Sequence, residues 1–194
     1  MTDFTLSAKR EKALPETAMD EGSAFDICAD FRTMLKILRM LDDPEVLDEH
    51  KNALLCKWFF SQNVPGNWQE VFGSFLRCGD APEPGGRKEL DYEFDAPEIY
   101  ASFMQLYGID LYETDMHWWK FRALLTGCIS CPCALSEKLR LRNLDVSRCA
   151  DKAKAQRAKD SVQIPEGIGE NERLVTKLLE ERLSKGEDIS DLLR

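Results

Sequence analysis

The segment MHWWKFRALL, residues 116–125, places aromatic and aliphatic side chains at the spacing of an amphipathic helix. At about 100° per residue, Trp118, Phe121 and Leu125 fall on one side of that helix, and Trp119 lies roughly a quarter-turn away. A buried tryptophan contributes a large apolar area and needs an acceptor for its indole N–H. We therefore expect this helix to define the core, to pack on two neighbours, and only secondarily to offer a contact surface.

Apolar periodicity predicts helices in most of the remaining chain as well. The expected N-caps are Asp30, Asp43, Asn67, Asp95 and, for the helix of residues 116–125, Thr114 or Asp115. The expected ends of these helices are Asp42, Phe60, Gly79, Gly108 and Gly127. Further helices are expected at about 135–143, 146–160 and 170–184. The start at Asp95 is the clearest, because Pro97 and Glu98 follow it as in a capping box.

Short connections between these helices predict a mainly α-helical, compact bundle. Alternating residues around Gly22 predict a small N-terminal β-hairpin before the first helix. The expected organisation is a flexible N-terminus at 1–13, a helical domain at 14–160, and a linker with a C-terminal amphipathic helix at 161–194. Because a short amphipathic helix is marginal alone, we expect it to dock on the domain or on another copy, giving a possible homo-oligomer.

The charge of the chain restricts the partners that it can bind. A net charge of −9 argues against a general nucleic-acid binder, and no apolar run is long enough to span a membrane. Residues 1–16 lack a secretory signal, so we expect a cytoplasmic protein. Acidic residues dominate 80–115 and basic residues dominate 138–159. This asymmetry indicates either an interaction surface or two solvated faces, of which solvated faces are the more common.

Seven cysteines are present, which in a reducing compartment favours free thiols. Four of them, Cys128, Cys131, Cys133 and Cys149, could supply the tetrahedral set that zinc prefers. Their spacing departs from the usual two separated C-x-x-C pairs, and Pro132 equally suits a turn at a helix end. We therefore expect no metal and no cofactor, with zinc at these cysteines as the less favoured alternative.

The sequence offers little for catalysis. Only His50 and His117 could act as imidazole bases, and neither stands beside a recognisable nucleophile turn. The phosphate-binding and dinucleotide-binding glycine motifs are missing, as is the G-x-S-x-G nucleophile motif. We expect no enzyme, and interpret His117 as a polar residue of the core or its rim.

The run YEFDAPEIYASFMQLYGIDLYETDMHWWKFRALLTG, residues 92–127, resembles the signature of the bacteriophage gene-product-fifteen family. The matching residues are Asp95, Ile99, Tyr100, Ala101, Phe103, Tyr107, Gly108, Ile109, Asp110, Leu111, His117, Trp118, Trp119, Phe121, Ala123, Leu124 and Leu125. A second block matches at Asp30, Phe31 and Arg32. The resemblance covers about residues 14–142, and neither the cysteine cluster nor the tail beyond Asp145 belongs to it.

The resemblance implies a role in building the tails of phages and prophages of Gram-positive bacteria. Members of the family are thought to be tail assembly chaperones, which would keep the tape-measure protein soluble and recruit the tail-tube protein in the host bacterial cytoplasm. It implies no catalytic residues. The alternatives are a structural component of the virion, such as a tail or connector protein, and, less favoured, a cysteine–zinc protein.

Overall fold

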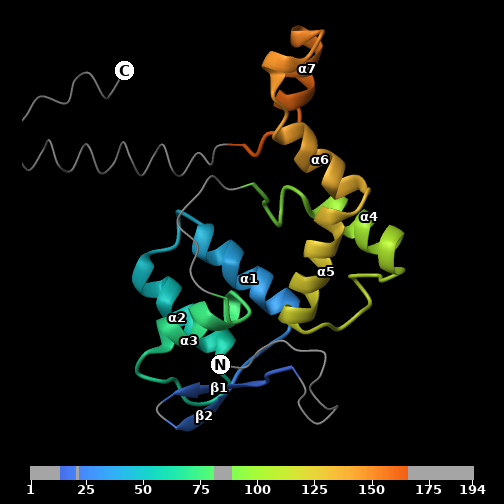
Figure 1. Ribbon diagram of the computed structural model, residues 1–194. Coiled ribbons are helices and arrows are strands. Elements are labelled where there is room, and N and C mark those ends of the chain that lie inside the picture. The colour runs from blue at the N-terminus through green and yellow to red at the C-terminus, as the bar shows by residue number, and fades with distance from the viewer. Residues whose placement is uncertain (1–13, 21, 81–88, 166–194) are drawn as a thin grey trace, which may run out of the picture.

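The computed structural model describes residues 14–20, 22–80 and 89–165. The strands are β1 (Thr17–Asp20) and β2 (Ser23–Asp26), and the helices are α1 (Phe31–Asp42), α2 (Asp48–Phe59), α3 (Trp68–Leu76), α4 (Ala96–Tyr107), α5 (Trp118–Ser130), α6 (Ala134–Arg142), the 3-10 helix η1 (Val146–Arg148) and α7 (Lys152–Asp160). The predicted mainly α-helical fold with a small N-terminal hairpin is confirmed (Figure 1). The expected N-terminal segment 1–13 and the expected C-terminal amphipathic helix lie outside the described residues.

The hairpin joins the helices through backbone pairing at its exit. β1 and β2 are antiparallel, and Gly22 takes a positive φ of 83° in the turn between them. Directly after β2, Ile27 forms a bridge with Phe60, and the N–H of Cys28 donates to the carbonyl of Phe59 over 2.7 Å. The hairpin is therefore anchored to the end of α2.

The start of α5 is fixed by backbone hydrogen bonds to the residues that lead into α1. The N–H of Trp118 donates to Ala29 over 2.7 Å, and the N–H of Phe31 donates to Met116 over 3.0 Å. Asp30 and His117 form an isolated antiparallel bridge between them. The expected start at Thr114 or Asp115 is therefore wrong, because the residues before Trp118 pair in an extended conformation.

Other helix limits also differ from expectation. α2 begins at Asp48 rather than directly after Pro44, since residues 43–47 form a turn and an extended approach. α5 continues past Gly127 to Ser130. The helix expected at 146–160 is broken into η1 and α7 by two capping aspartates, Asp145 and Asp151, whose side chains accept from the backbone N–H groups of Ser147 and Lys154.

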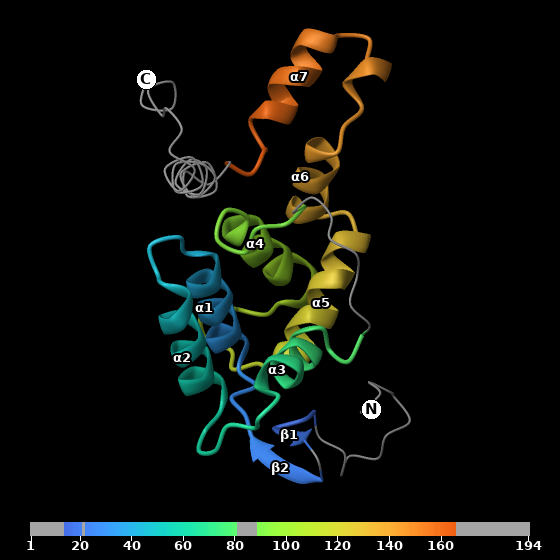
Figure 2. The same cartoon turned by 90° about the vertical axis from the view of Figure 1, so that its left-hand side faces the viewer.

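The helices form two regions of different character. In the first, which we call the body (the described residues up to 142), α5 packs against α1, α4 and α6, and α2 lies beside α1. In the second, which we call the arm (residues 143–165), η1 and α7 extend beyond α6 at the end of the molecule opposite the hairpin (Figures 1 and 2). No helix in the described residues is long and apolar enough to cross a membrane.

Candidate functional site

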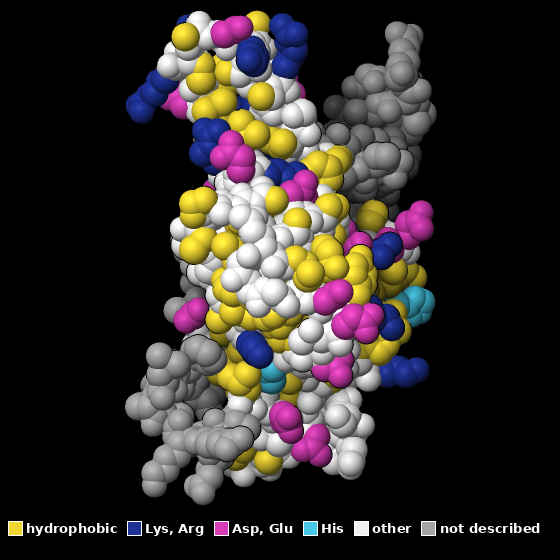
Figure 3. Space-filling model, turned by 90° about the vertical axis from the view of Figure 1, so that its right-hand side faces the viewer, with side chains coloured by type: hydrophobic (Ala, Val, Ile, Leu, Met, Phe, Trp, Pro, Cys, Tyr) yellow, Lys and Arg dark blue, Asp and Glu magenta, His cyan; other side chains and the backbone are white. Residues whose placement is uncertain are grey.

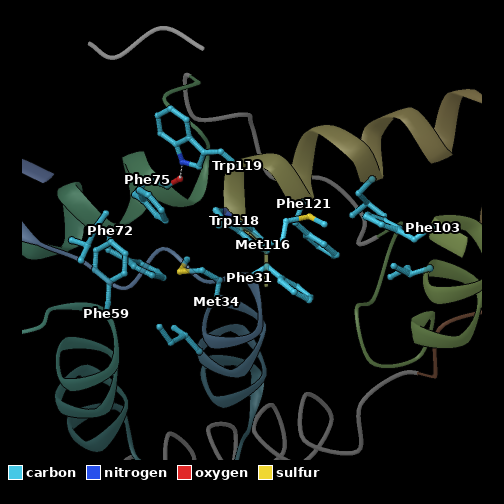
Figure 4. Packing of buried hydrophobic residues seen from close by; sticks show 14 of the residues in the cluster. Phe31, Met34, Phe59, Phe72, Phe75, Phe103, Met116, Trp118, Trp119 and Phe121 are labelled. Atoms are coloured by element: carbon cyan, nitrogen blue, oxygen red, sulfur yellow. Dashed lines mark hydrogen bonds between the residues drawn. The ribbon is translucent and has the colours of Figure 1, made fainter. Parts of the chain in front are cut away.

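The two tryptophans of the MHWWKFRALL segment bind the C-terminal turn of α3. The indole N–H of Trp118 donates to the carbonyl of Leu76 over 3.0 Å, and that of Trp119 donates to Phe75 over 2.9 Å (Figure 4). Carbonyls in the last turn of a helix have no partner within the helix, and Trp118 supplies a donor to that of Leu76. The carbonyl of Phe75 also accepts from the N–H of Cys78 over 3.0 Å, so Trp119 adds a second donor there. Both tryptophans are buried, and the pair therefore ties α3 to α5.

Below the tryptophans, aromatic rings connect α1, α5 and α4. The ring of Phe121 stacks on Phe31 with centroids 4.9 Å apart and on Phe103 with centroids 5.4 Å apart. Tyr107 extends this packing, and its hydroxyl donates to the carbonyl of Leu124 over 2.8 Å. Gly127 lies under that hydroxyl, where a Cβ atom would collide with it. Gly127 therefore makes room for Tyr107, and α5 continues past it to Ser130.

His117 is the N-cap of α5. Its Nδ1 accepts a hydrogen bond from the N–H of Trp119 over 3.0 Å, so the proton of the neutral ring is on Nε2, which lies 3.0 Å from the carbonyl of Pro15. Burial lowers the pKa of His117 below its ordinary value, against the opposing effect of the Pro15 carbonyl. Both ring nitrogens are engaged in structural contacts, so His117 is positioned to cap a helix rather than to move a proton.

Arg32 holds the loop between α4 and α5. Its Nη2 donates to the carbonyls of Leu111, Tyr112 and Thr114 over distances of 2.9–3.1 Å, and its Nη1 pairs with Asp115 at 3.2 Å. A single guanidinium therefore binds three carbonyls and one carboxylate of the same loop. Arg32 lies in the first turn of α1, so the loop is fixed to the body.

The same loop is also fixed from within. Asp110 accepts from the N–H of Tyr112 over 2.9 Å, and its own carbonyl accepts from Thr114 over 3.0 Å. Gly108, which ends α4 as predicted, has a left-handed φ of 64° that few other residues tolerate. Asp30 meanwhile caps α1 by accepting from Thr33. Gly108 and the polar signature residues Asp30, Arg32 and Asp110 thus set the path of the backbone.

Together with α4, this fixed loop presents an aromatic surface, which we call the loop patch and define as the exposed Met104, Tyr112 and Glu113 and the half-buried Tyr100 and Asp110. Tyr112 is 81% exposed and its ring lies 5.2 Å from that of Tyr100. Met104, one turn beyond Tyr100 on α4, is 42% exposed. Desolvation and the nearby charge of Asp110 raise the pKa of Tyr100. The loop patch therefore combines apolar area, two ring faces and carboxylates on a backbone that is held in place.

A buried ion network, which was not predicted from the sequence, joins α4 to α6. The Asp95 carboxylate is fully buried and receives two hydrogen bonds from Arg142, of 2.9 and 2.7 Å. Lys138 lies 3.0 Å from Asp95 and 2.8 Å from Glu98. The predicted capping box is therefore wrong, because the side chain of Asp95 binds α6 instead of its own helix. Arg142 also donates to the carbonyl of Val162 over 2.8 Å, which links the network to the arm.

The charges in this network stabilise one another. Burial by itself raises the pKa of Asp95, but hydrogen bonds from Arg142, the N–H of Asp91 and Lys138 outweigh it, so the pKa lies below its ordinary value. A clue was present in the sequence of α6, where Leu135, Lys138, Leu139 and Arg142 share one helical face. Basic residues that lie on the buried face of a helix need acidic partners inside the protein. Basic residues that are solvated show no preference for that face.

The four cysteines of the zinc alternative have separate environments. Cys128 and Cys133 are buried, Cys131 is exposed, and the Sγ of Cys133 lies 3.0 Å from the carbonyl of Cys128. Cys149 lies in the arm, where its Sγ contacts the carbonyl of Asp145. Within the described ranges, no group of three or more histidine, cysteine, aspartate or glutamate side chains is arranged to hold a metal ion. Cys133 stands at the N-cap of α6, where its N–H donates to Ser136.

Two open pockets border α1 and the residues that lead into it. A pocket of about 240 Å³ is formed by α1 and the residues before α4, and its lining is Leu35, Leu38, Arg39, Asp42, Asp43, Asp91, Tyr92 and Glu93. We call it the α1 groove. A second pocket, of about 550 Å³, lies at the hairpin exit and is lined by Glu16, Thr17, Asp26, Ile27, Cys28, Ala29, Asp30, Asp115, Met116 and His117. Carboxylates outnumber cations in both linings.

These features define a mainly helical protein whose signature side chains are used to build the core and to fix one surface loop. The profile described as "Bacteriophage Gp15 protein" matches residues 11–163, and the chain belongs to this phage protein family. No curated protein and no solved structure matches the chain in the corresponding comparisons. The match includes every signature residue, from Asp30 to Leu125.

Proposed function

We propose that this protein is a non-enzymatic tail assembly chaperone that binds the tape-measure protein and tail-tube subunits of its phage in the host cytoplasm. The observation that carries the proposal is the family match over residues 11–163. The use of the signature residues agrees with a binding role, since His117, Arg32 and Tyr107 are each engaged in hydrogen bonds that shape the fold. A chaperone of this kind needs a stable fold with exposed binding surfaces, and it needs no catalytic group.

The α1 groove is the surface that we assign to the tape-measure protein. Leu35, Leu38 and Tyr92 give it apolar area. Its carboxylates, which include Asp43 and Glu93, outnumber its one cation, Arg39, which pairs with Glu93 at 3.5 Å. Tape-measure proteins are long and helical, so an amphipathic helix that carries lysine or arginine beside its apolar stripe fits both properties of the groove. Apolar contact would supply affinity, and the excess of carboxylates in the lining would select basic segments.

Co-expression with the tape-measure protein of the same phage tests the proposal. We expect the full chain to raise the soluble yield of the tape-measure protein and to purify with it. Leu38→Glu, which places a charge in the groove, is expected to reduce the copurified amount by roughly tenfold, since it removes apolar contact and repels the groove's own carboxylates. Val64→Glu, at an exposed apolar position outside the groove, is the matched control and should bind like the wild type.

Mass spectrometry of purified particles distinguishes this role from that of a virion component. A chaperone is expected to be missing from finished particles, whereas a structural tail or connector protein would be present in a regular copy number. A regular copy number, together with an unchanged yield of soluble tape-measure protein, would refute the chaperone proposal in favour of the structural one.

A further inference from the structure

The arm is attached to the body through polar contacts and little apolar area. Among the residues of α7 only Ala155 is buried. Gln163 donates to the carbonyl of Arg142 over 3.3 Å, and Arg142 donates to the carbonyl of Val162 over 2.8 Å. Within the arm, Lys159 donates to the carbonyl of Leu144 over 2.8 Å. A helix of this length is marginal alone, so these contacts fix the position of α7 while leaving most of its surface uncovered.

The uncovered surface of α7 is strongly basic. Lys152, Lys154 and Arg157 are exposed, and none of them forms an ion pair within the part of the chain that the structure describes. Within α7 itself, four basic residues stand against one acidic residue, Asp160, in a chain whose net charge is −9. The rest of the protein is therefore even more acidic than the total indicates. The face drawn in Figure 3 shows lysine and arginine side chains gathered at the α7 end and aspartate and glutamate side chains toward the hairpin end.

The loop patch has the complementary properties. The rings of Tyr100 and Tyr112 offer faces that attract a lysine or arginine head group, and the carboxylates of Asp110 and Glu113 lie beside them. The aliphatic stem of such a side chain can pack on Met104. Because Arg32 already holds the loop, docking there requires little additional ordering of the backbone.

We propose that α7 of one copy of this protein docks on the loop patch of a second copy. The contacts of Lys159 and Gln163 keep α7 beyond α6, away from the loop patch of its own chain, so the contact joins two molecules (Figures 1 and 2). The two surfaces are different, so the assembly is head-to-tail, and it forms a closed ring or an open chain according to the rotation between copies. This inference does not depend on the proposed chaperone role.

Sedimentation velocity of the full-length protein is the first test. We expect reversible, concentration-dependent association at about 0.05 M NaCl, with at least about tenfold weaker association at about 0.5 M NaCl because salt screens exposed charges. A species that remains monomeric at every protein concentration and at low salt would overturn the proposal. An association that nuclease treatment abolishes would overturn it as well, because the basic arm would then be binding nucleic acid.

Variants of each surface provide the decisive test. The triple variant Lys152→Glu, Lys154→Glu, Arg157→Glu removes the basic surface, and the double variant Tyr112→Ser, Glu113→Lys removes the loop patch. Each alone is expected to be monomeric. When the two variants are mixed, the loop patch of the triple variant can bind the α7 of the double variant. A 1:1 heterodimer is therefore expected, and it cannot grow further because its remaining α7 and loop patch are both mutated.

Circular dichroism establishes that each variant is folded before it is mixed. Lys120→Glu is the control for the triple variant, because it also makes the chain more negative. It lies at an exposed position of α5, outside both surfaces, and should associate like the wild type. Two folded variants that each associate as the wild type does would contradict the proposal. So would variants that are monomeric separately and remain monomeric when mixed, since that outcome indicates a symmetric interface.

Discussion

The body and the arm of this protein are stabilised by different kinds of contact. In the body, Trp118, Phe121 and Phe103 form a continuous aromatic core. The indole N–H of Trp118 also donates a hydrogen bond to the last turn of α3. In the arm, α7 buries a single alanine and depends on hydrogen bonds to Leu144 and Arg142. Apolar burial is shared by many residues and cooperative, whereas a few partly exposed hydrogen bonds can open locally. The comparison indicates that the body is the scaffold and the arm is an appendage available for contact.

The largest effect is expected from removing the central tryptophan of the body. Trp118→Ala leaves a cavity in the core and frees the carbonyl of Leu76, and we expect it to lower the free energy of unfolding by roughly 3–5 kcal/mol. Urea denaturation followed by circular dichroism measures this loss. Trp58→Ala, which removes a half-buried tryptophan at the edge of the core, is the control and should cost clearly less. Equal losses at the two positions would contradict the assignment of Trp118 to the centre of the core.

Breaking the ion network at the boundary between the two regions is expected to have the next largest effect. Arg142→Met leaves the carboxylate of Asp95 buried without its two strongest hydrogen bonds, and we expect a loss of about 3 kcal/mol near neutral pH. The double variant Arg142→Met, Asp95→Leu removes the stranded charge as well and should recover part of that stability. If the double variant is less stable than the single one, Asp95 is not a buried partner of Arg142.

Lowering the pH is expected to weaken the body through His117. Burial holds the pKa of folded His117 below its ordinary value, so the unfolded chain takes up the proton first. Stability that is fully present above about pH 6.5 is therefore lost as the pH falls, by up to about 1 kcal/mol, because a protonated ring cannot accept from Trp119. Urea midpoints between about pH 7.5 and about pH 5.5 measure the loss. His117→Asn keeps a capping oxygen without a titrating group, and an unchanged pH dependence in that variant would exclude His117 as its source.

The smallest effect is expected in the arm. Lys159→Met removes the hydrogen bond to Leu144 but keeps the aliphatic stem of the side chain, so the cost is under about 1 kcal/mol. Limited proteolysis should show faster cleavage within the arm, while the urea midpoint of the body stays the same. A shift of the global midpoint comparable with that of Arg142→Met would show that the arm folds as one unit with the body.

Much of the fold could be predicted because it follows from local periodicity. The hairpin around Gly22, the cap at Asp30 and the helix end at Gly108 each depend on a few neighbouring residues, and each is found where expected. The start of α5 depends on backbone pairing with residues before α1, which lie far away in the sequence. Gly127 also could not be interpreted from its neighbours in sequence. It is a glycine because a side chain there would collide with Tyr107, and not because the helix ends there.

The long-range polar contacts were harder to predict from sequence than the apolar core. Asp95 looks like an ordinary cap, and only the three-dimensional arrangement brings Arg142 and Lys138 to it. Arg32 likewise carries no local sign that it binds the carbonyls of Leu111 and Tyr112, about eighty residues away. Long polar side chains reach across elements, so their partners are set by tertiary packing and not by helical period.

The division between a fixed body and a locally held arm is tested most directly by native-state hydrogen exchange on the full-length protein. The amides of α7 are expected to exchange through local opening, with a free energy well below that of the α5 amides, which should exchange only through global unfolding. Weak denaturant should change the α5 rates strongly and the α7 rates little. If α7 and α5 amides share one opening free energy and one denaturant dependence, the arm is an integral part of the core and the division is wrong.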